Sequence, residues 1–467
     1  VYCPKCWWSD DWDPMQYGQE IDFSRPFFKQ FHELSLEVPH LAIVNTKSVN
    51  SEYTNQCEEN KDCYMLAACG RCERCVYSNW LQDTCYYIGD SYAMEKSEFC
   101  YECMNSTRCR SCSYLYDSTD CISCHMSIDL RGCSNCFGCV GLRGKNYCFF
   151  NEQLTKEEYE KRIEGLLSTR ESIEETRKKF REFSLKFPRK FYHGSKNAGN
   201  VGTIGDYAES TRDVFESFNC RHDENLAYCQ DAWYSKDTWD STEIFAELSY
   251  ECQGGSPLVR CIAGRSCWDL LDSYYTDMCF GGSNLFGCFS LRQKHYCILN
   301  KQYSKEDYGK LKAKLIEHMK RGGEWGEYYP ASISPFAYNE STAQDYFPLT
   351  REEALAQGHT WYDRPERGYK ITMKAVELPK TIAEVGNSIF QQIIECDSQT
   401  SEEKKKSHPI CTTAYTIIPM ELELYRKLNI PLPEKCFPCR RQERFSLRNP
   451  RALWKSNCQC ALSHLSH

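Results

Sequence analysis

The middle of the chain alternates short apolar pieces with polar corners. Pieces such as CYYI, SYLY and YCFF are separated by polar groups such as DST and RGKN, and their apolar residues do not recur at helical spacing. Runs of three or four aromatic or β-branched residues between turn-forming residues are typical of short strands. The pattern therefore predicts a chain that is mainly β in its centre.

Cysteines mark a period within this region. The spacing is 21 residues in three pairs, which are Cys100 with Cys121, Cys103 with Cys124, and Cys112 with Cys133. Three short strands and three turns fit into that length, so the spacing predicts a parallel β-helix with about 21 residues per coil. Residues one coil apart stack in such a fold. We therefore expect Cys100 to lie over Cys121 and Cys112 over Cys133.

A longer duplication predicts two related copies of this β-helix. The segment SNCFGCVGLRGKNYCFFNEQLTKEEYEK starting at Ser134 reappears as SNLFGCFSLRQKHYCILNKQYSKEDYGK starting at Ser283, an offset of 149 residues. This offset places Cys121 on Leu270, Cys124 on Ser273, Cys133 on Gly282 and Cys136 on Leu285. A metal site would not survive these replacements, which favours buried, inert thiols over metal or redox chemistry. A site present only in the first copy is the alternative.

Each copy is followed by a helical pattern. After Thr155, which is a suitable helix cap, Tyr159 and Ile163 recur at helical spacing, and two helices joined near residues 168–171 are predicted. The segment YSKEDYGKLKAKLIEHMKRGG predicts one helix that is stopped by Gly322 and Gly323. Such helices commonly cover an open end or edge of a coil.

These patterns predict seven segments. They are an N-terminal remnant of a zinc module with a linker (1–50), the first β-helix copy (51–152), a helical segment (153–193), the second copy (194–301), a helix (302–323), an extended linker (324–375), and a C-terminal helix with a zinc-ribbon-like or treble-clef-like module (376–467).

Composition narrows the class of protein. The chain has 467 residues, 32 cysteines and a net charge of -8. No apolar run reaches the length of a bilayer span, and no secretory signal opens the chain. We therefore expect a cytoplasmic protein whose thiols stay reduced, so metal sites and buried free cysteines outrank disulfides. The net charge argues against a globally basic nucleic-acid coat, although a local basic patch remains compatible with it.

The last part of the chain carries a metal-binding pattern. Cys436 and Cys439 are separated by two residues, and Cys411 precedes them by 25 residues. Two intervening residues let one turn aim both thiolates at one ion, and zinc needs four ligands in a tetrahedron. Two residues compete for the fourth position: His408, and Cys396 at the end of a helix predicted over TIAEVGNSIFQQIIEC. The predicted cofactor is zinc.

Both ends of the chain carry further candidate ligands. The tail reads CQCALSHLSH, and its spacing could form a compact second site from Cys458, Cys460, His464 and His467. At the start of the chain, Cys3 and Cys6 form half of a site. We expect its other half to lie upstream of Val1; the alternative is that the two chain ends share a metal.

Several motifs carry a resemblance. VYCPKCWWSDDWDPMQYGQEIDFSRPFFKQFHEL, LRGKNYCFFNEQLTKEEY, DYFPLTREEAL and KLNIPLPEKCFPCRRQERFSLRNPRALW together resemble a family of cysteine-rich, zinc-ribbon-containing proteins of candidate-phylum bacteria with small genomes. The resemblance covers nearly the whole chain and implies a zinc-binding C-terminal unit. That family often has cysteine in the first knuckle of this unit, so His408 is a departure from its pattern.

A basic run follows the last pair of predicted zinc ligands. It contains Arg440, Arg441, Arg444, Arg448, Arg451 and Lys455, together with the aromatic Trp454. Arginines for phosphate and aromatics for base stacking favour contact with RNA or single strands; a solvated basic face is the alternative. The sequence thus predicts a non-enzymatic zinc-binding scaffold that contacts RNA or another protein. The alternative is a β-helix enzyme acting on polysaccharide, or a thiol redox protein.

Overall fold

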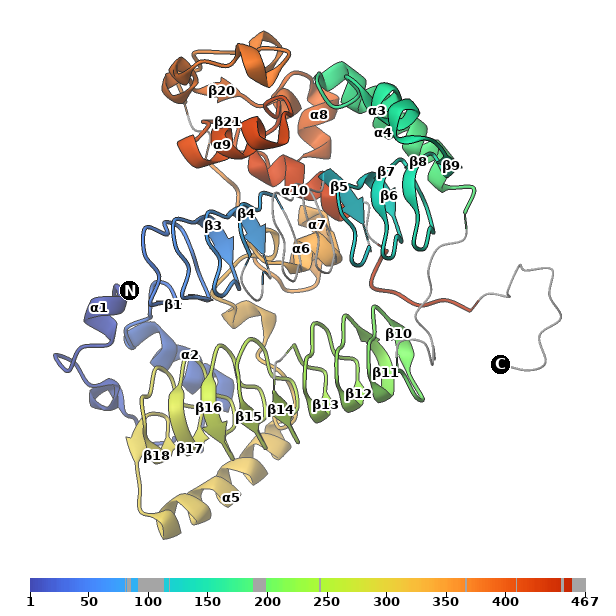
Figure 1. Ribbon diagram of the computed structural model, residues 1–467. Coiled ribbons are helices and arrows are strands. Elements are labelled where there is room, and N and C mark those ends of the chain that lie inside the picture. The colour runs from blue at the N-terminus through green and yellow to red at the C-terminus, as the bar shows by residue number, and fades with distance from the viewer. Residues whose placement is uncertain are drawn as a thin grey trace. The chain divides into compact units, whose positions relative to one another are not determined.

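The chain divides into two compact units. The computed structural model describes residues 1–79, 81, 85–90, 113–116, 118–187, 199–242, 245–365, 368–408, 410–446 and 449–455. One unit contains Val1–Ala42, Phe191–Trp361 and Asn449–His467, and the other contains Ile43–Lys190 and Tyr362–Arg448. Each unit is built around its own β-solenoid (Figure 1).

The first solenoid belongs to the unit that contains Ile43–Lys190. Its strands are β1 (Asn45–Thr46), β2 (Cys57–Glu58), β3 (Tyr64–Ala67), β4 (Val76–Asn79), β5 (Ser113–Tyr116), β6 (His125–Ile128), β7 (Ser134–Phe137), β8 (Asn146–Phe149) and β9 (Glu152–Gln153). β1 pairs with β2, β3 pairs with β4, and β5 to β8 pair in succession, all in parallel, whereas β9 turns back antiparallel to β8.

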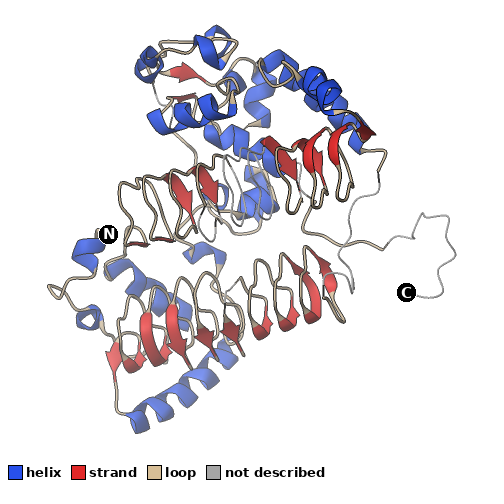
Figure 2. Cartoon of the chain, in the orientation of Figure 1, coloured by secondary structure: helices blue, strands red, loops and turns tan. Residues whose placement is uncertain are grey.

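The second solenoid belongs to the other unit and forms one ten-stranded sheet in sequence order. Its strands are β10 (Ile204–Asp206), β11 (Arg212–Phe218), β12 (Glu224–Ala227), β13 (Lys236–Trp239), β14 (Ala246–Glu247), β15 (Leu258–Val259), β16 (Trp268–Leu271), β17 (Phe280–Phe286), β18 (His295–Ile298) and β19 (Lys301–Gln302). All pairs are parallel except that of β18 with β19 (Figure 2).

The mainly β fold and the parallel β-helix are confirmed, but the predicted coil of 21 residues is wrong. Tyr64 pairs with Val76 and Cys136 pairs with Cys148, so one coil contains 12 residues. Interior residues recur every third position along the coil, and 21 is also a multiple of three. The 21-residue spacing therefore relates interior positions on different sides of the coil.

The predicted stacking partners can be placed only in part. Cys100 and Cys112 lie outside the described residues. Cys121 and Cys133 occupy neighbouring coils, because the N–H of Ile122 donates to the carbonyl of Cys133 at 3.0 Å. These two cysteines are thus related to each other by one coil.

Every third residue of the coil has a left-handed backbone. Along one stretch the φ angles are 53° at Asp231, 57° at Tyr234, 49° at Asp237 and 50° at Asp240. Valine, isoleucine and threonine do not occur at the left-handed positions of the described coils. A β-branched side chain is strained in this conformation, whereas aspartate and asparagine tolerate it. This rule, rather than strand alternation, sets the residue pattern on the outside of the solenoids.

Interior side chains join adjacent coils through hydrogen bonds. The Oγ of Ser127 accepts from the N–H of Cys139 at 3.0 Å and donates to the carbonyl of His125 at 2.8 Å. One coil later, the Sγ of Cys139 accepts from the N–H of Asn151 and donates to the carbonyl of Phe137, both at 3.4 Å. Cysteine and serine therefore perform the same task in the wall. The described cysteines between Cys57 and Cys297 are all buried, as predicted.

Replacing Cys139 separates this role from simple packing. We expect Cys139→Ser to change the free energy of unfolding little, because a hydroxyl can accept from the N–H of Asn151. Cys139→Val should destabilise by about 1–3 kcal/mol, since the partly buried N–H of Asn151 loses its acceptor. Denaturant unfolding of the two variants checks this. Equal losses in both would show that only the shape of the side chain matters.

The helices predicted after each solenoid are confirmed. They are α3 (Lys156–Ile163), α4 (Arg170–Ser184) and α5 (Lys305–Gly322). Thr155 caps α3 by accepting from the N–H of Glu158 at 3.2 Å, and α5 ends at Gly323, whose φ is 71°. Because they bury Tyr159 and Tyr308, α3 and α5 each cover the outside of the solenoid that precedes them.

Short helices surround the two solenoids. These are α1 (Pro4–Trp7), η1 (Pro14–Tyr17), α2 (Phe27–Glu37), η3 (Ala331–Ile333), η4 (Tyr338–Glu340), α6 (Ala343–Tyr346), α7 (Arg351–Ala356), η5 (Ala375–Glu377), η6 (Ile382–Glu384), η7 (Asn387–Gln391), η8 (Asp397–Gln399), α8 (Glu402–Ser407), α9 (Pro419–Leu428) and α10 (Phe437–Ser446). None of the helices in the described ranges is long and apolar enough to cross a membrane.

The helix predicted over residues 381–396 is wrong. The segment forms η6 and η7, which Gly386 separates, and then strand β20 (Ile394–Glu395). β20 pairs antiparallel with β21 (Ala414–Tyr415), so backbone hydrogen bonding across the two strands replaces helical bonding at this point. The pairing decides where Cys396 lies.

Candidate metal centre

Three short elements bring four cysteines together. Cys396 directly follows β20, and its N–H donates to the carbonyl of Thr413 at 2.9 Å across the strand pair. Cys411 lies just before β21. Cys436 immediately precedes α10, and Cys439 lies in its first turn. Two thiols thus come from a strand pair and two from the start of a helix.

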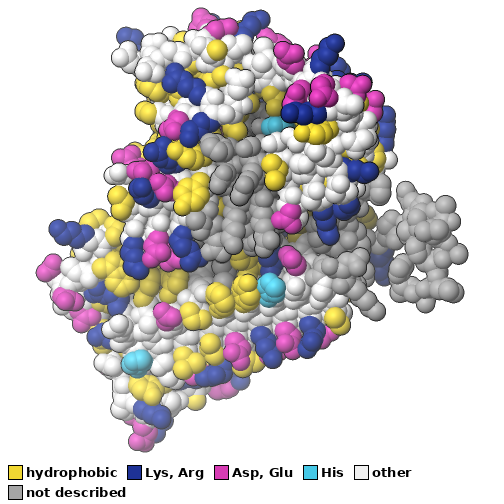
Figure 3. Space-filling model, viewed as in Figure 1, with side chains coloured by type: hydrophobic (Ala, Val, Ile, Leu, Met, Phe, Trp, Pro, Cys, Tyr) yellow, Lys and Arg dark blue, Asp and Glu magenta, His cyan; other side chains and the backbone are white. Residues whose placement is uncertain are grey.

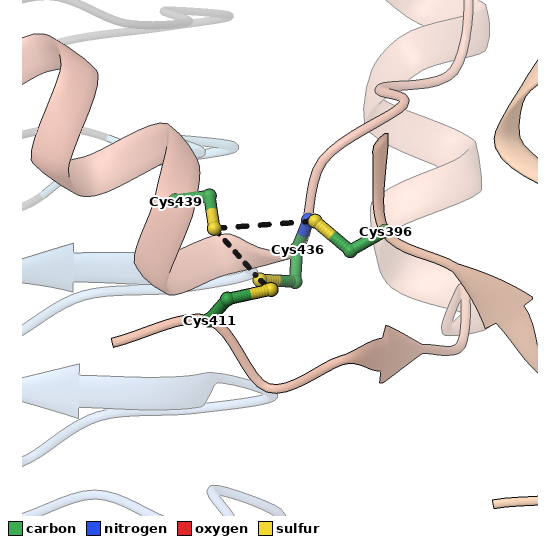
Figure 4. Close-up of side chains that lie close together, drawn as sticks. All are labelled: Cys396, Cys411, Cys436 and Cys439. Carbon is green, nitrogen blue, oxygen red and sulfur yellow. Dashed lines mark hydrogen bonds between the residues drawn. The ribbon is translucent and has the colours of Figure 1, made fainter. Parts of the chain in front are cut away.

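The four sulfur atoms form a compact cluster (Figure 4). They all lie within 4.8 Å of one another, with 3.9 Å between Cys396 and Cys439 and 3.8 Å between Cys411 and Cys436. A tetrahedron with metal–sulfur bonds of about 2.3 Å has sulfur–sulfur edges of about 3.8 Å. Cys411 is half-buried and the other three are buried. The cluster can therefore hold a metal ion.

Hydrogen bonds among the four thiols favour ionisation of two of them, Cys436 and Cys411. Hydrogen bonds from the thiol of Cys396, and then from those of Cys411 and Cys439, lower the pKa of Cys436. A hydrogen bond from Cys396 also lowers the pKa of Cys411, to about 7. Because thiolates rather than thiols bind metals, this arrangement prepares the cluster for a cation.

The structure places the other predicted ligands elsewhere. The Nε2 of His408 lies 3.4 Å from Glu443, and its Nδ1 lies 3.1 Å from the carbonyl of Lys404, so it is not in the sulfur cluster. Cys3 and Cys6 are exposed, and within the described ranges no third metal-binding side chain converges on them. The remaining candidates lie outside the described residues: Cys458, Cys460, His464 and His467.

Two arginines of the basic run are buried in ion pairs. The Nε of Arg440 donates to Asp90 at 2.9 Å, and Nη2 of Arg444 donates to the same carboxylate at 3.3 Å. The Nη2 of Arg440 also donates to Glu421 at 3.3 Å. The side chains of Arg440 and Asp90 are 5% and 1% exposed. Both arginines therefore attach α10 to the first solenoid.

The remaining residues of the basic run lie in different environments. Arg451 pairs with Asp231 of the second solenoid at 2.8 Å, and both side chains are buried. The guanidinium of Arg441 lies over the ring of Phe445 at 4.9 Å. Trp454 and Lys455 are exposed, whereas Arg448 lies outside the described residues. Acidic and basic side chains are interspersed on the surface drawn in Figure 3.

Sequence reasoning missed the carboxylates of this site. Asp90 lies 350 residues before Arg440, and Glu421 lies in α9 and is also buried. Burial raises the pKa of Glu421, and the charge of Arg440 opposes that rise. The only local signal was the spacing of Arg440 and Arg444, which places both on one face of a helix.

Comparisons with known proteins add little to the site. No protein family and no curated protein matches the sequence. Among solved structures, the crystal structure of a "putative acetyltransferase" from Desulfovibrio desulfuricans G20 is similar over 57% of this chain and 71% of that chain, with 10% sequence identity and a TM-score of 0.11. At that TM-score the similarity carries no argument about function.

Proposed function

We propose that the protein is a zinc-binding scaffold, in which zinc fixes a small C-terminal module on the side of a β-solenoid and the solenoids present surfaces to partners. The cluster of four sulfur atoms carries this proposal, because four cysteines in a tetrahedral arrangement favour zinc. Four protein ligands leave no open position for a substrate, which is typical of structural zinc. Two of the ligands come from a strand pair and two from the start of a helix, and this arrangement supports a treble-clef-like module.

The position of the module supports a scaffold. Cys436 and Cys439 fix the start of α10, and Arg440 and Arg444 on that helix hold the carboxylate of Asp90 in the first solenoid. Zinc binding and docking of the module are therefore coupled through one helix. Because those arginines are occupied by carboxylates, we favour a protein partner over RNA.

The thiols support a reducing compartment. The cysteines in the described ranges form no disulfide with one another, and most of them are buried in the solenoid walls. Reduced thiols in this number are typical of the cytoplasm, where we place the protein.

Metal analysis of the purified chain tests the zinc proposal. We expect wild-type protein to contain about one more zinc per chain than Cys439→Ser, since that variant loses one of four ligands. Cys139→Ser, which changes a buried wall thiol, should retain the wild-type content. Elemental analysis by plasma mass spectrometry gives both numbers. Equal zinc in wild type and Cys439→Ser, or a loss in Cys139→Ser, would contradict the assignment of the site.

A further inference from the structure

The first solenoid contacts α10 through one ring of an aromatic pair. Tyr64 and Tyr77 lie one coil apart with their ring centroids 5.7 Å apart and an interplanar angle of 89°. Phe437, the first residue of α10, stacks on Tyr77 at 4.9 Å and 21°. The aromatic pair thus receives the first turn of the docked helix.

An aspartate completes this binding arrangement. Asp90 is the next left-handed residue on the same side of the coil after Tyr77, since Val76 pairs with Gly89. The guanidinium of Arg440 lies over the ring of Tyr77 at 5.3 Å and reaches Asp90. The recognised element is therefore a helix with an aromatic residue followed three positions later by an arginine.

The second solenoid presents the same arrangement. The rings of Phe215 and Tyr228 lie 5.6 Å apart at an interplanar angle of 88°. Phe215 pairs with Ala227 and Ala227 pairs with Trp239, just as Tyr64, Val76 and Gly89 pair in succession in the first solenoid. Asp240 follows Trp239 with a φ of 50°, as Asp90 follows Gly89 with a φ of 56°.

The two rings of this second arrangement are exposed among the described residues. Phe215 is 42% exposed and Tyr228 is 51% exposed, whereas Tyr77 in the occupied arrangement is 8% exposed. Burial raises the pKa of Asp240, and no cation among the described residues lowers it. Burial, and then the charges of Asp240 and Glu327, raise the pKa of Glu251 to about 7. The surface therefore combines accessible aromatic rings with carboxylates that lack a cationic partner among the described residues.

The exposed rings continue an interface that is already formed within this unit. On the same side of the coil, Trp239 is followed in register by Tyr250, Ile262, Tyr274 and Phe286. The last three belong to the apolar cluster covered by α2 and α5. Figure 1 shows α5 running alongside β15 to β18 of this solenoid. One side of the solenoid is thus covered by helices along part of its length, and the aromatic and acidic part extends beyond them.

We propose that Phe215, Tyr228 and Asp240 form a docking site for a helix of a partner protein that carries an aromatic residue followed three positions later by an arginine. The aromatic residue packs on Tyr228 and the arginine binds Asp240. This inference deepens the proposed scaffold function by naming the kind of partner, and it does not depend on the identity of the metal.

The structure argues against a second copy of the metal module as the occupant. Where Gly89 lies in the first solenoid, a β-carbon would collide with Leu424 of α9, which packs beside α10. The second solenoid has Trp239 at the corresponding position. Its indole would exclude an α9-like neighbour, so the site accepts a helix with α10-like side chains but not the module itself.

The described part of the C-terminal segment lies beside Tyr228, and Asp240 is exposed. Arg451 pairs with Asp231, and Ala452 and Leu453 line a cavity of about 250 Å³ together with Glu216 and Tyr228. Asp240 is not among the residues that line this cavity. A partner helix would therefore lie next to this segment.

A labelled peptide tests the site in the full chain. The probe is a helix-stapled, fluorescein-labelled peptide with the sequence of residues 434–446, in which both cysteines are serine, and its binding is followed by fluorescence anisotropy. We expect saturable binding that Asp240→Asn weakens about tenfold or more, since hydrogen bonds between charged groups are the strong ones. The exposed Asp269→Asn is the matched control and should bind as wild type does. A peptide with Arg440→Gln should lose affinity for the wild-type chain but not for Asp240→Asn.

The outcomes separate this inference from the proposed function. Absence of saturable binding, or binding that Asp240→Asn leaves unchanged, overturns the docking site even when the zinc content is as proposed. A concentration-dependent dimer that Asp240→Asn dissociates would assign the surface to a second copy and overturn the partner-protein inference. Zinc content is measured for each variant and should not change with Asp240→Asn.

Discussion

Cys436→Ser is expected to release one metal ion and to unfold the C-terminal module while the solenoids remain folded. Structural zinc contributes about 10–16 kcal/mol of folding free energy in small modules, far more than the short β20–β21 pair and α10 can supply themselves. The loss should appear as rapid hydrogen exchange over residues 394–446. The main thermal transition of the solenoids should persist.

Two controls make this result specific. A chelator added to the wild-type chain should produce the same exchange pattern as the variant. Cys139→Ser should produce none of it, because that thiol lies in the solenoid wall and, in the part of the chain that the structure describes, belongs to no group of side chains that could hold a metal. If the C-terminal module of Cys436→Ser stayed protected from hydrogen exchange, packing alone would be sufficient to keep it folded.

Asp90→Asn is expected to destabilise the unit that contains the first solenoid by about 3–5 kcal/mol. The substitution removes the carboxylate that Arg440 and Arg444 share, although Arg440 keeps its hydrogen bond to Glu421. Uncompensated buried charge is costly because it has lost its hydration. Urea unfolding monitored over this unit measures the change.

Glu59→Gln is the matched control in the same solenoid. Glu59 pairs with Lys47 at 3.1 Å, but the two side chains are 46% and 78% exposed. Exposed pairs contribute about 0–1 kcal/mol, so this variant should unfold much like wild type. Similar losses from Asp90→Asn and Glu59→Gln would indicate that the buried pair is unimportant.

The sequence allowed much of the fold to be predicted because its local signals are strong. Short apolar pieces between polar corners predicted the parallel solenoid, and Thr155 with Glu158 marked the start of α3. The coil length could not be read correctly from the cysteines. Interior positions recur every third residue, so any spacing that is a multiple of three can relate one interior cysteine to another. Only the pairing of strands, such as that of Cys136 with Cys148, shows which spacing is the length of a coil.

The candidate site was only partly predictable for a related reason. Cys436 and Cys439 lie in one turn, so their spacing alone predicts that they bind together. Cys396 joins them through the pairing of β20 with β21, a contact between segments that the sequence does not link. The pairing of the α10 arginines with Asp90 could not be predicted, because Asp90 is far away along the chain.

Each of the two units is built from segments that are far apart in the sequence, and this affects how the protein assembles during its synthesis. Arg440 leaves the ribosome 350 residues after Asp90, which takes about 20–70 s at usual rates of synthesis. Throughout that interval the nascent first solenoid exposes Tyr64, Tyr77 and Asp90, and any helix with the matching side chains can occupy them. A metal ion could enter the cluster only when Cys436 and Cys439 have emerged, so its binding would come late in assembly and would close a surface that was open during translation.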